Sequence, residues 1–249
     1  MRIDEAGWLV AEQGDPKVSK IAGDRGRTCG LDSGKPLGVV WHWTAGPCKN
    51  PKTSENLAKS LSTFDRIKDR AASWHVIISK AGELIQSYTF NVGTWHVGRP
   101  GRIGGTPTQL QDGTWEHSGK LFSNVNRCTL GVELENSGEL QKIGDSYYCW
   151  PFWKNPSDAQ DLRVPDSACE IPEERVTDWE GKYFDGYTPA QEDAAQRLLH
   201  ACIRRYKWKR EVCAYGHTHF DWARKSDPGP LWLDGVLPNL LLSTFGPVP

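Results

Sequence analysis

The segment Gly38–Trp43, GVVWHW, constrains the fold more than any other part of the chain. Its β-branched and aromatic residues favour an extended conformation, and the run predicts a buried strand. The small residues Ala45-Gly46-Pro47 then end it as a turn. A histidine inside such a strand, His42, is either a satisfied core residue or a ligand at the strand's end, so the rest of the chain must decide its role.

Other segments supply the partners of this strand. Apolar residues at helical spacing predict an amphipathic helix over 53–70, and two apolar runs around a Lys-Ala-Gly turn predict a hairpin over 73–90. Further strands are predicted over 129–136 and 212–217. The clearest helix spans 188–206, because its first residues, TPAQ, form a capping box with proline at the first helical position.

This order of elements predicts one α/β domain, a mixed central β-sheet flanked by α-helices, over residues 37–249. Residues 1–36 are expected to be an irregular lead-in, and residues 97–119 a glycine-rich loop. Residues 137–187 carry many Trp, Pro and Asp residues without a clear period, so they are interpreted as a long insertion. One short strand is expected inside it, at 146–150.

Composition narrows the possible partners. The formal net charge is -1, with 30 Lys and Arg against 31 Asp and Glu, so no basic excess points to nucleic acid. No apolar run reaches the roughly 18 residues of a membrane-spanning helix, and the acidic start of the chain predicts no secretion signal. We therefore expect a protein that is made in the cytoplasm, acts as a monomer and does not bind membranes.

The cysteines argue against two kinds of scaffold. Seven occur, an odd number, and no Cys-x-x-Cys pair is present. A complete disulfide framework and a cysteine-only zinc site are both disfavoured, and most of the thiols are expected to be reduced and structural.

Two predicted strands end in histidine, at His42 and at His217, and Asp227 follows ten positions after the second. A local pair with a distant third ligand is a common way to build a metal site. Two imidazoles and one carboxylate leave one position open on tetrahedral zinc, which is the catalytic rather than the structural arrangement. His219 is expected either to contact one of the metal ligands or to be an alternative ligand itself. His117 and His200 are assigned to packing or to the surface.

Six segments along the chain together form one sequence pattern. They are VVWHWTAGP, SWHVIISKAGELIQ, GTWHVG, LGVELENSG, YTPAQ and GHTHFDWARKSDPGP. Their order resembles that of the zinc-dependent N-acetylmuramoyl-L-alanine amidases, a family that also includes phage lysozyme-type amidases and peptidoglycan recognition proteins. The resemblance covers residues 37–231, leaves 137–187 unmatched, and is closest to the branch whose third ligand is Asp. It implies a mixed sheet flanked by helices, with zinc at one edge.

Carried over by matching position, the resemblance implies that one Zn²⁺ is held by His42, His217 and Asp227. Glu133, in GVELE, would be the catalytic carboxylate, and Lys225 would lie beside the substrate carbonyl. Each role has a physical basis: the metal acidifies its water, the carboxylate moves protons, and the ammonium stabilises an oxyanion. Glu135 is the alternative carboxylate, since alternate strand residues point to the same side.

The substrate-binding candidates are aromatic. Trp95 and His96, in GTWHVG, match a family segment close to bound substrate, and Trp43 and Trp74 are added to them. Trp74 stands where the phage lysozyme-type branch has a tyrosine that is thought to take part in catalysis. Because an indole cannot exchange protons near neutral pH, the proton transfer is assigned to Glu133.

The predicted function is hydrolysis of the amide between the lactyl group of N-acetylmuramic acid and L-alanine in peptidoglycan, by a phage-type lytic enzyme. Two alternatives stay open. One is a peptidoglycan-binding module without activity, which the complete set of ligands opposes. The other is a zinc amidase acting on another acyl-amino-acid bond, which only substrate profiling distinguishes. An effector or a recycling enzyme would also fit the expected lack of an export signal.

Overall fold

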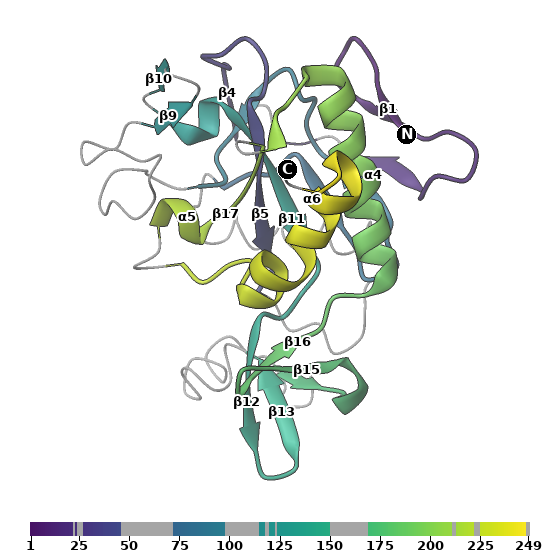
Figure 1. The fold of residues 1–249 in the computed structure, drawn as a ribbon, viewed down its shortest axis with the longest axis vertical. Coiled ribbons are helices and arrows are strands. Elements are labelled where there is room, and N and C mark those ends of the chain that lie inside the picture. The colour runs from purple at the N-terminus through teal and green to yellow at the C-terminus, as the bar shows by residue number, and fades with distance from the viewer. Residues whose placement is uncertain are drawn as a thin grey trace.

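The computed structural model describes residues 1–21, 23, 27–45, 72–97, 115–117, 120–122, 124–149, 169–210, 213–221 and 225–247. They form an α/β unit with a smaller β-sheet projecting from one end (Figure 1). The helix predicted over 53–70 lies outside the described residues. Within the described part, no helix is long and apolar enough to cross a membrane.

The central sheet has six strands. In spatial order they are β17 (Ala214–Gly216), β5 (Gly38–Trp43), β11 (Thr129–Leu134), β6 (Val76–Ile78), β7 (Leu84–Gln86) and β3 (Val18–Lys20). The strands from β17 to β6 run parallel, whereas β7 pairs antiparallel with β6, and β3 runs parallel to β7. The predicted mixed sheet is therefore confirmed, and so is the hairpin of β6 and β7.

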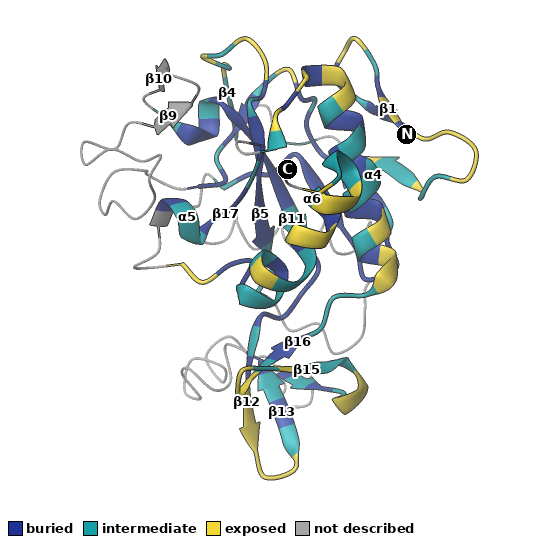
Figure 2. Cartoon of the chain, viewed as in Figure 1, coloured by how far each residue is buried: buried dark blue, intermediate teal, exposed yellow. Residues whose placement is uncertain are grey.

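One face of this sheet is covered by two helices, α4 (Pro189–Tyr206) and α6 (Leu237–Phe245) (Figure 1). The α4 helix begins as predicted: Thr188 caps it, and Gln191 completes the capping box. Its apolar stripe is buried against the sheet, whereas its outer face is exposed (Figure 2). The core of the molecule thus lies between α4, α6 and the central strands.

Strand alternation divides β5 between two environments. Val39 and Trp41 face the helices and belong to the main core. Val40 lies on the opposite face, in a second cluster with residues such as Tyr215 and Phe220. His42 follows Val40 on that second face, so the histidine points away from the helical layer.

The segment predicted as a largely irregular insertion forms a second, five-stranded antiparallel sheet. Its strands are β14 (Glu170–Ile171), β13 (Ser146–Cys149), β12 (Glu139–Ile143), β16 (Lys182–Asp185) and β15 (Val176–Trp179). Only β13 was predicted. The outer residues of the β12–β13 hairpin are exposed, so its sequence lacks the apolar alternation by which a half-buried strand is recognised (Figure 2).

A buried ion network joins the two sheets. Asp185, at the end of β16, is fully buried and accepts hydrogen bonds from Lys80 Nζ at 3.1 Å and from Arg175 Nη2 at 2.7 Å. Its second oxygen also accepts from the backbone N–H of Ser137 at 2.8 Å. Because Lys80 belongs to the turn of the β6–β7 hairpin, this carboxylate ties the projecting sheet to the central one.

The predicted irregular lead-in is also more ordered than expected. Four short strands lie within it: β1 (Arg2–Ile3), β2 (Leu9–Val10), β3 and β4 (Thr28–Cys29). β1 and β2 pair with each other, and β3 joins the central sheet. Strands of two or three residues are too short to produce a period in the sequence.

Further helices and strands were not predicted. Part of the expected glycine-rich loop is a strand, β9 (Trp115–His117), which pairs with β10 (Lys120–Phe122). Two short helical segments, α5 (Thr218–Asp221) and the π-helical Leu231–Val236, lie on either side of Asp227, and the second continues into α6.

Candidate metal centre and active site

Three elements bring the candidate ligands together. His42 is the fifth residue of β5, and His217 directly follows β17, the parallel neighbour of β5. Because the carboxyl ends of parallel strands meet at one edge of a sheet, these histidines are adjacent. Asp227 returns to them after α5, and its carbonyl oxygen accepts a hydrogen bond from the backbone N–H of Thr218 at 3.1 Å.

The three side chains converge on one point. His42 Nδ1 lies 3.0 Å from His217 Nδ1 and 2.9 Å from Asp227 Oδ2, and His217 Nδ1 lies 3.0 Å from the same oxygen. All three residues are buried. A tetrahedral ion with ligands at about 2.0 Å holds its donors about 3.3 Å apart, so a small opening of this triangle would admit one.

The chemistry of the donors also fits a cation. The backbone carbonyl of Val97 lies 3.2 Å from His217 Nε2, so this nitrogen carries the proton and Nδ1 presents a lone pair to the cluster. Asp227 adds an anionic oxygen at the same point. Lone pairs packed this closely are stabilised by a positive charge between them. The residues therefore fit a zinc ion, in agreement with the expected ligand set.

Burial prepares these groups for metal binding. Burial, and after it the charge of the nearby His217, lower the pKa of His42 to about 4, against the raising effect of Asp227. The imidazole is thus neutral near pH 7, as a ligand must be. For Asp227, burial raises the pKa, but the charges and hydrogen bonds of His217 and His42 outweigh it and hold the pKa well below its usual range.

The candidate catalytic carboxylate lies beside this cluster. Glu133 on β11 is paired in register with His42 on β5, so both side chains occupy the same face of the sheet. It is only partly buried. Glu135 does not share this position: it lies beyond the end of β11, is fully buried, and accepts a hydrogen bond from the backbone N–H of Lys80 at 2.7 Å. The geometry therefore favours Glu133.

Lys225 lies two residues before Asp227, and its side chain is exposed. Its positive charge is close enough to contribute to the lowered pKa of His42. A cation at this place can act on negative charge that develops near the cluster.

The four predicted substrate-binding residues lie in different surroundings. Trp95 is half-buried. Trp74 instead packs in an apolar cluster with Ile77 and Ile85. Trp43 is partly buried, and its ring lies against Gly138 and Gly229, where a Cβ atom would come within 2.9 and 2.6 Å of it.

The fourth of these residues, His96, is enclosed by the protein. It is 8% exposed, and its Nδ1 lies 3.1 Å from Nε2 of His42. Its ring therefore lies behind a candidate ligand, on the side of His42 opposite to the nitrogen that faces His217. Trp74 and His96 are buried because each completes a packed layer on the second face of the sheet.

Two polar residues near the cluster were missed by sequence reasoning. The Tyr187 hydroxyl donates to the carbonyl of Pro228 at 2.8 Å, next to Asp227. The Asn126 side chain accepts from the backbone N–H groups of His96 and Val97, both at 2.8 Å. Neither has a sequence signal of its own, because each acts through a backbone group distant in the chain.

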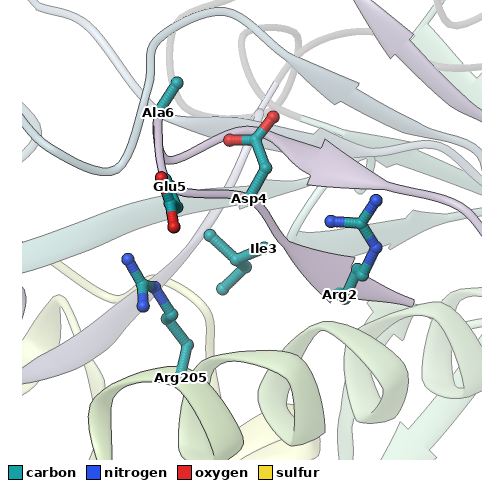
Figure 3. Close-up of a pocket in the computed structure, with 6 residues that line it drawn as sticks. All are labelled: Arg2, Ile3, Asp4, Glu5, Ala6 and Arg205. Atoms are coloured by element: carbon teal, nitrogen blue, oxygen red, sulfur yellow. The ribbon is translucent and has the colours of Figure 1, made fainter.

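A separate pocket lies between β1 and α4 (Figure 3). Its lining contains two arginines, Arg2 and Arg205, and two carboxylates, Asp4 and Glu5. The charges balance one another, and none of these residues belongs to the His-His-Asp cluster.

A family model described as N-acetylmuramoyl-L-alanine amidase matches residues 32–230, which include all three residues of the cluster and Glu133. The chain belongs to this family. None of the curated proteins compared with it matches its sequence. The amidase family assignment thus comes from the family pattern itself.

Solved structures match this chain at low sequence identity, and the first of those named here shares its fold. A selenomethionine derivative of AmpD is 19% identical, has a TM-score of 0.56, and is matched over 96% of this chain and 99% of its own. AmiD from E. coli, in a complex with an anhydro-N-acetylmuramic acid peptide substrate, is 19% identical with a TM-score of 0.47, over 96% of this chain and 65% of its own. A mutant endolysin from Bacillus subtilis is 15% identical with a TM-score of 0.49, over 92% and 99%.

Proposed function

We propose that this member of the amidase family is a zinc-dependent N-acetylmuramoyl-L-alanine amidase. In this proposal it hydrolyses the amide between the lactyl group of N-acetylmuramic acid and L-alanine. The observation that carries it is the convergence of His42, His217 and Asp227 at one edge of the sheet, with Glu133 paired in register with His42. A peptidoglycan-binding module without activity would not need this complete set.

The chain's own residues would divide the chemistry. His42, His217 and Asp227 would hold one zinc ion, which supplies Lewis acidity for water and for the amide carbonyl. Glu133 takes a proton from the attacking water as the new C–O bond forms. It then delivers that proton to the alanine nitrogen as the C–N bond breaks. Lys225 stabilises the negative charge that the carbonyl oxygen carries after the C–O bond has formed and before the C–N bond breaks.

The test uses purified protein, cell-wall peptidoglycan and soluble muropeptides, with and without a chelator. We expect new L-alanine amino termini that disappear on chelation and return with zinc. Their absence from zinc-loaded protein would overturn the proposal. Release from other acyl-amino-acid amides, with none from muropeptides, would instead assign the same chemistry to another substrate.

We further propose a phage-type lytic role, with peptidoglycan as the partner and a monomeric enzyme. A lytic enzyme clears a suspension of intact cell walls, whereas a recycling enzyme acts on soluble anhydro-muropeptides. Turbidity loss on walls by a protein that elutes as a monomer is expected. Activity confined to small anhydro-muropeptides would contradict the lytic role.

A further inference from the structure

His96 lies directly behind one candidate ligand, His42. Its Nδ1 lies 3.1 Å from His42 Nε2, and its own Nε2 lies 3.3 Å from the hydroxyl of Thr129. We propose that His96 is a positioning residue that fixes the tautomer and orientation of His42, so that Nδ1 of His42 presents its lone pair to the metal. This inference rests on the proposed zinc function.

The direction of the hydrogen bonds follows from Thr129. Its hydroxyl donates to the carbonyl of Val125 at 2.8 Å, so the oxygen accepts from Nε2–H of His96. A neutral imidazole carries one N–H group, and Nδ1 of His96 is therefore an acceptor. It accepts from Nε2–H of His42. His42 then has no proton on Nδ1, which faces His217 and Asp227.

His96 is held in a built position. Its backbone N–H and that of Val97 both donate to the Asn126 side chain, which is fully buried. Its ring lies directly over Gly131 on β11. A Cβ atom at Gly131 would come within 2.5 Å of Cγ of His96, so only glycine admits the ring there.

The next residue serves the second histidine. The carbonyl of Val97 accepts from His217 Nε2 at 3.2 Å, which leaves Nδ1 of His217 without a proton. Two consecutive residues, anchored by one asparagine, thus orient both imidazoles. Partners of this kind raise metal affinity because they fix the ring and its basicity.

The same contacts assign a role that differs from substrate binding. Both ring nitrogens of His96 are engaged by the protein, and its surface is almost wholly buried. The effect of His96 on catalysis would therefore pass through His42.

The experiment compares zinc affinity, measured by competition with a chromophoric chelator, across two pairs of variants. His96→Phe keeps the ring volume but loses both nitrogens, and we expect its zinc Kd to rise about 10- to 100-fold. His96→Gln offers an acceptor oxygen to His42 and should recover part of the loss. Thr129→Val removes the hydroxyl that sets the direction of the hydrogen bonds from His42 through His96. It should bind zinc several-fold more weakly than Thr129→Ser.

A second readout does not need the metal. Nitrogen-15 NMR of the metal-free protein should show His42 protonated at Nε2 alone, and a mixture of tautomers in His96→Phe. Leu198→Ala, in the core on the other face of the sheet, is the control for simple destabilisation. It should lower the melting temperature while the zinc Kd and the His42 tautomer stay as in the wild type.

The outcomes separate the two proposals. A wild-type zinc Kd together with a single Nε2–H tautomer of His42 in His96→Phe would overturn the positioning role and leave the amidase proposal standing. Failure of the wild type to bind zinc one to one would overturn the zinc function, while the NMR comparison still tests the tautomer. If His96→Phe does not fold, the Thr129 pair decides, and equal values for Val and Ser contradict the inference.

Discussion

Glu133 and His42 stand opposite each other in the parallel pairing of β11 with β5. Residues paired in this way project from the same face, so a carboxylate that is still partly accessible lies next to a buried imidazole that belongs to the metal cluster. This relationship places the proposed proton carrier and the proposed ligand on two adjacent strands whose spacing is fixed by backbone hydrogen bonds.

Replacing Glu133 by glutamine tests the proposed proton transfer. We expect Glu133→Gln to lower kcat about 100-fold or more, because the amide keeps the shape but cannot accept the proton from water. Zinc affinity should stay close to that of the wild type. Release of L-alanine amino termini measures the first quantity, and chelator competition the second.

Glu135→Gln is the matched control for that variant. Glu135 is fully buried and accepts a hydrogen bond from the backbone N–H of Lys80. Exchanging this charged acceptor for a neutral amide should lower the free energy of unfolding by about 1–3 kcal/mol. The folded fraction should retain its kcat. Wild-type turnover in Glu133→Gln, or a larger loss in Glu135→Gln than in Glu133→Gln, would contradict the assignment.

Zinc should stabilise the protein through Asp227. At a free zinc concentration about 100 times Kd, binding to the native state alone adds about 2.7 kcal/mol to the free energy of unfolding. Asp227→Ala should lose this stabilisation, whereas Asp234→Ala, at an exposed carboxylate nearby in the chain, should keep it. Differential scanning fluorimetry with and without zinc gives the comparison, and an unchanged shift in Asp227→Ala would exclude this residue as a ligand.

Acid should destabilise the protein through His75, which is not a candidate ligand. Its Nε2 donates to the Val92 carbonyl, and its Nδ1 accepts from the backbone N–H of Gly131 at 3.0 Å. Protonation of Nδ1 would break the second bond. Burial accordingly lowers the pKa of His75 to about 4, although the bond to Val92 opposes this shift.

The sign follows from the two states. The unfolded chain binds a proton at His75 near pH 6.5, and the native protein only near pH 4. The contribution of neutral His75 to the free energy of unfolding is therefore complete above pH 6.5 and is lost as the pH falls towards 4. The loss should amount to about 3 kcal/mol. Urea unfolding of metal-free wild type and His75→Gln across this range isolates it, since His42 changes in the same direction in both. Parallel curves for the two proteins would refute the role of His75.

Gly131→Ala tests the close approach of His96 to β11. The added methyl would meet Cγ of His96 at 2.5 Å, and the crowding should cost about 1–3 kcal/mol of stability and weaken zinc binding. Gly30→Ala is the control, because the nearest atom to its Cβ is the end of Arg127 at 3.8 Å. Chemical denaturation and chelator competition should show both effects in Gly131→Ala and neither in Gly30→Ala.

Asp185→Asn tests the joint between the two sheets. Removing the negative charge leaves Lys80 and Arg175 beside a neutral amide in a buried place, and we expect a loss of about 3–5 kcal/mol. Asp193→Asn, which removes an exposed pair with Arg197 on α4, should cost less than about 1 kcal/mol. Equal effects in guanidinium unfolding would mean that the buried network contributes no more than a surface ion pair.

The elements that could be predicted from the sequence are those with long, regular patterns. The β5 strand and the α4 helix were predicted at their observed bounds, because one is a continuous apolar run and the other has a capping box and a clear stripe. The small β12–β16 sheet was largely missed, since its strands are short and in part exposed on both faces.

The residues of the candidate site could likewise be predicted only in part. His42, His217 and Asp227 could be grouped from strand ends and residue chemistry, and the structure brings them together. The position of His96 behind His42 could not be derived, because it depends on an unoccupied Cβ position at Gly131 and on a side chain at Asn126. Such contacts join residues far apart in the chain and leave no period or spacing.

The alternation along β11 couples folding to reactivity. Thr129, Gly131 and Glu133 share the face that bears the histidines, whereas Leu130, Val132 and Leu134 fill the core beneath α4. A slip of this strand by a single residue would exchange the two sets, placing a carboxylate in the core beneath α4 and three aliphatic side chains among the histidines. The energetic penalty against that slip protects the core packing and the position of Glu133 together. A chain whose central strands are paired in the correct register has therefore already placed its proton donor.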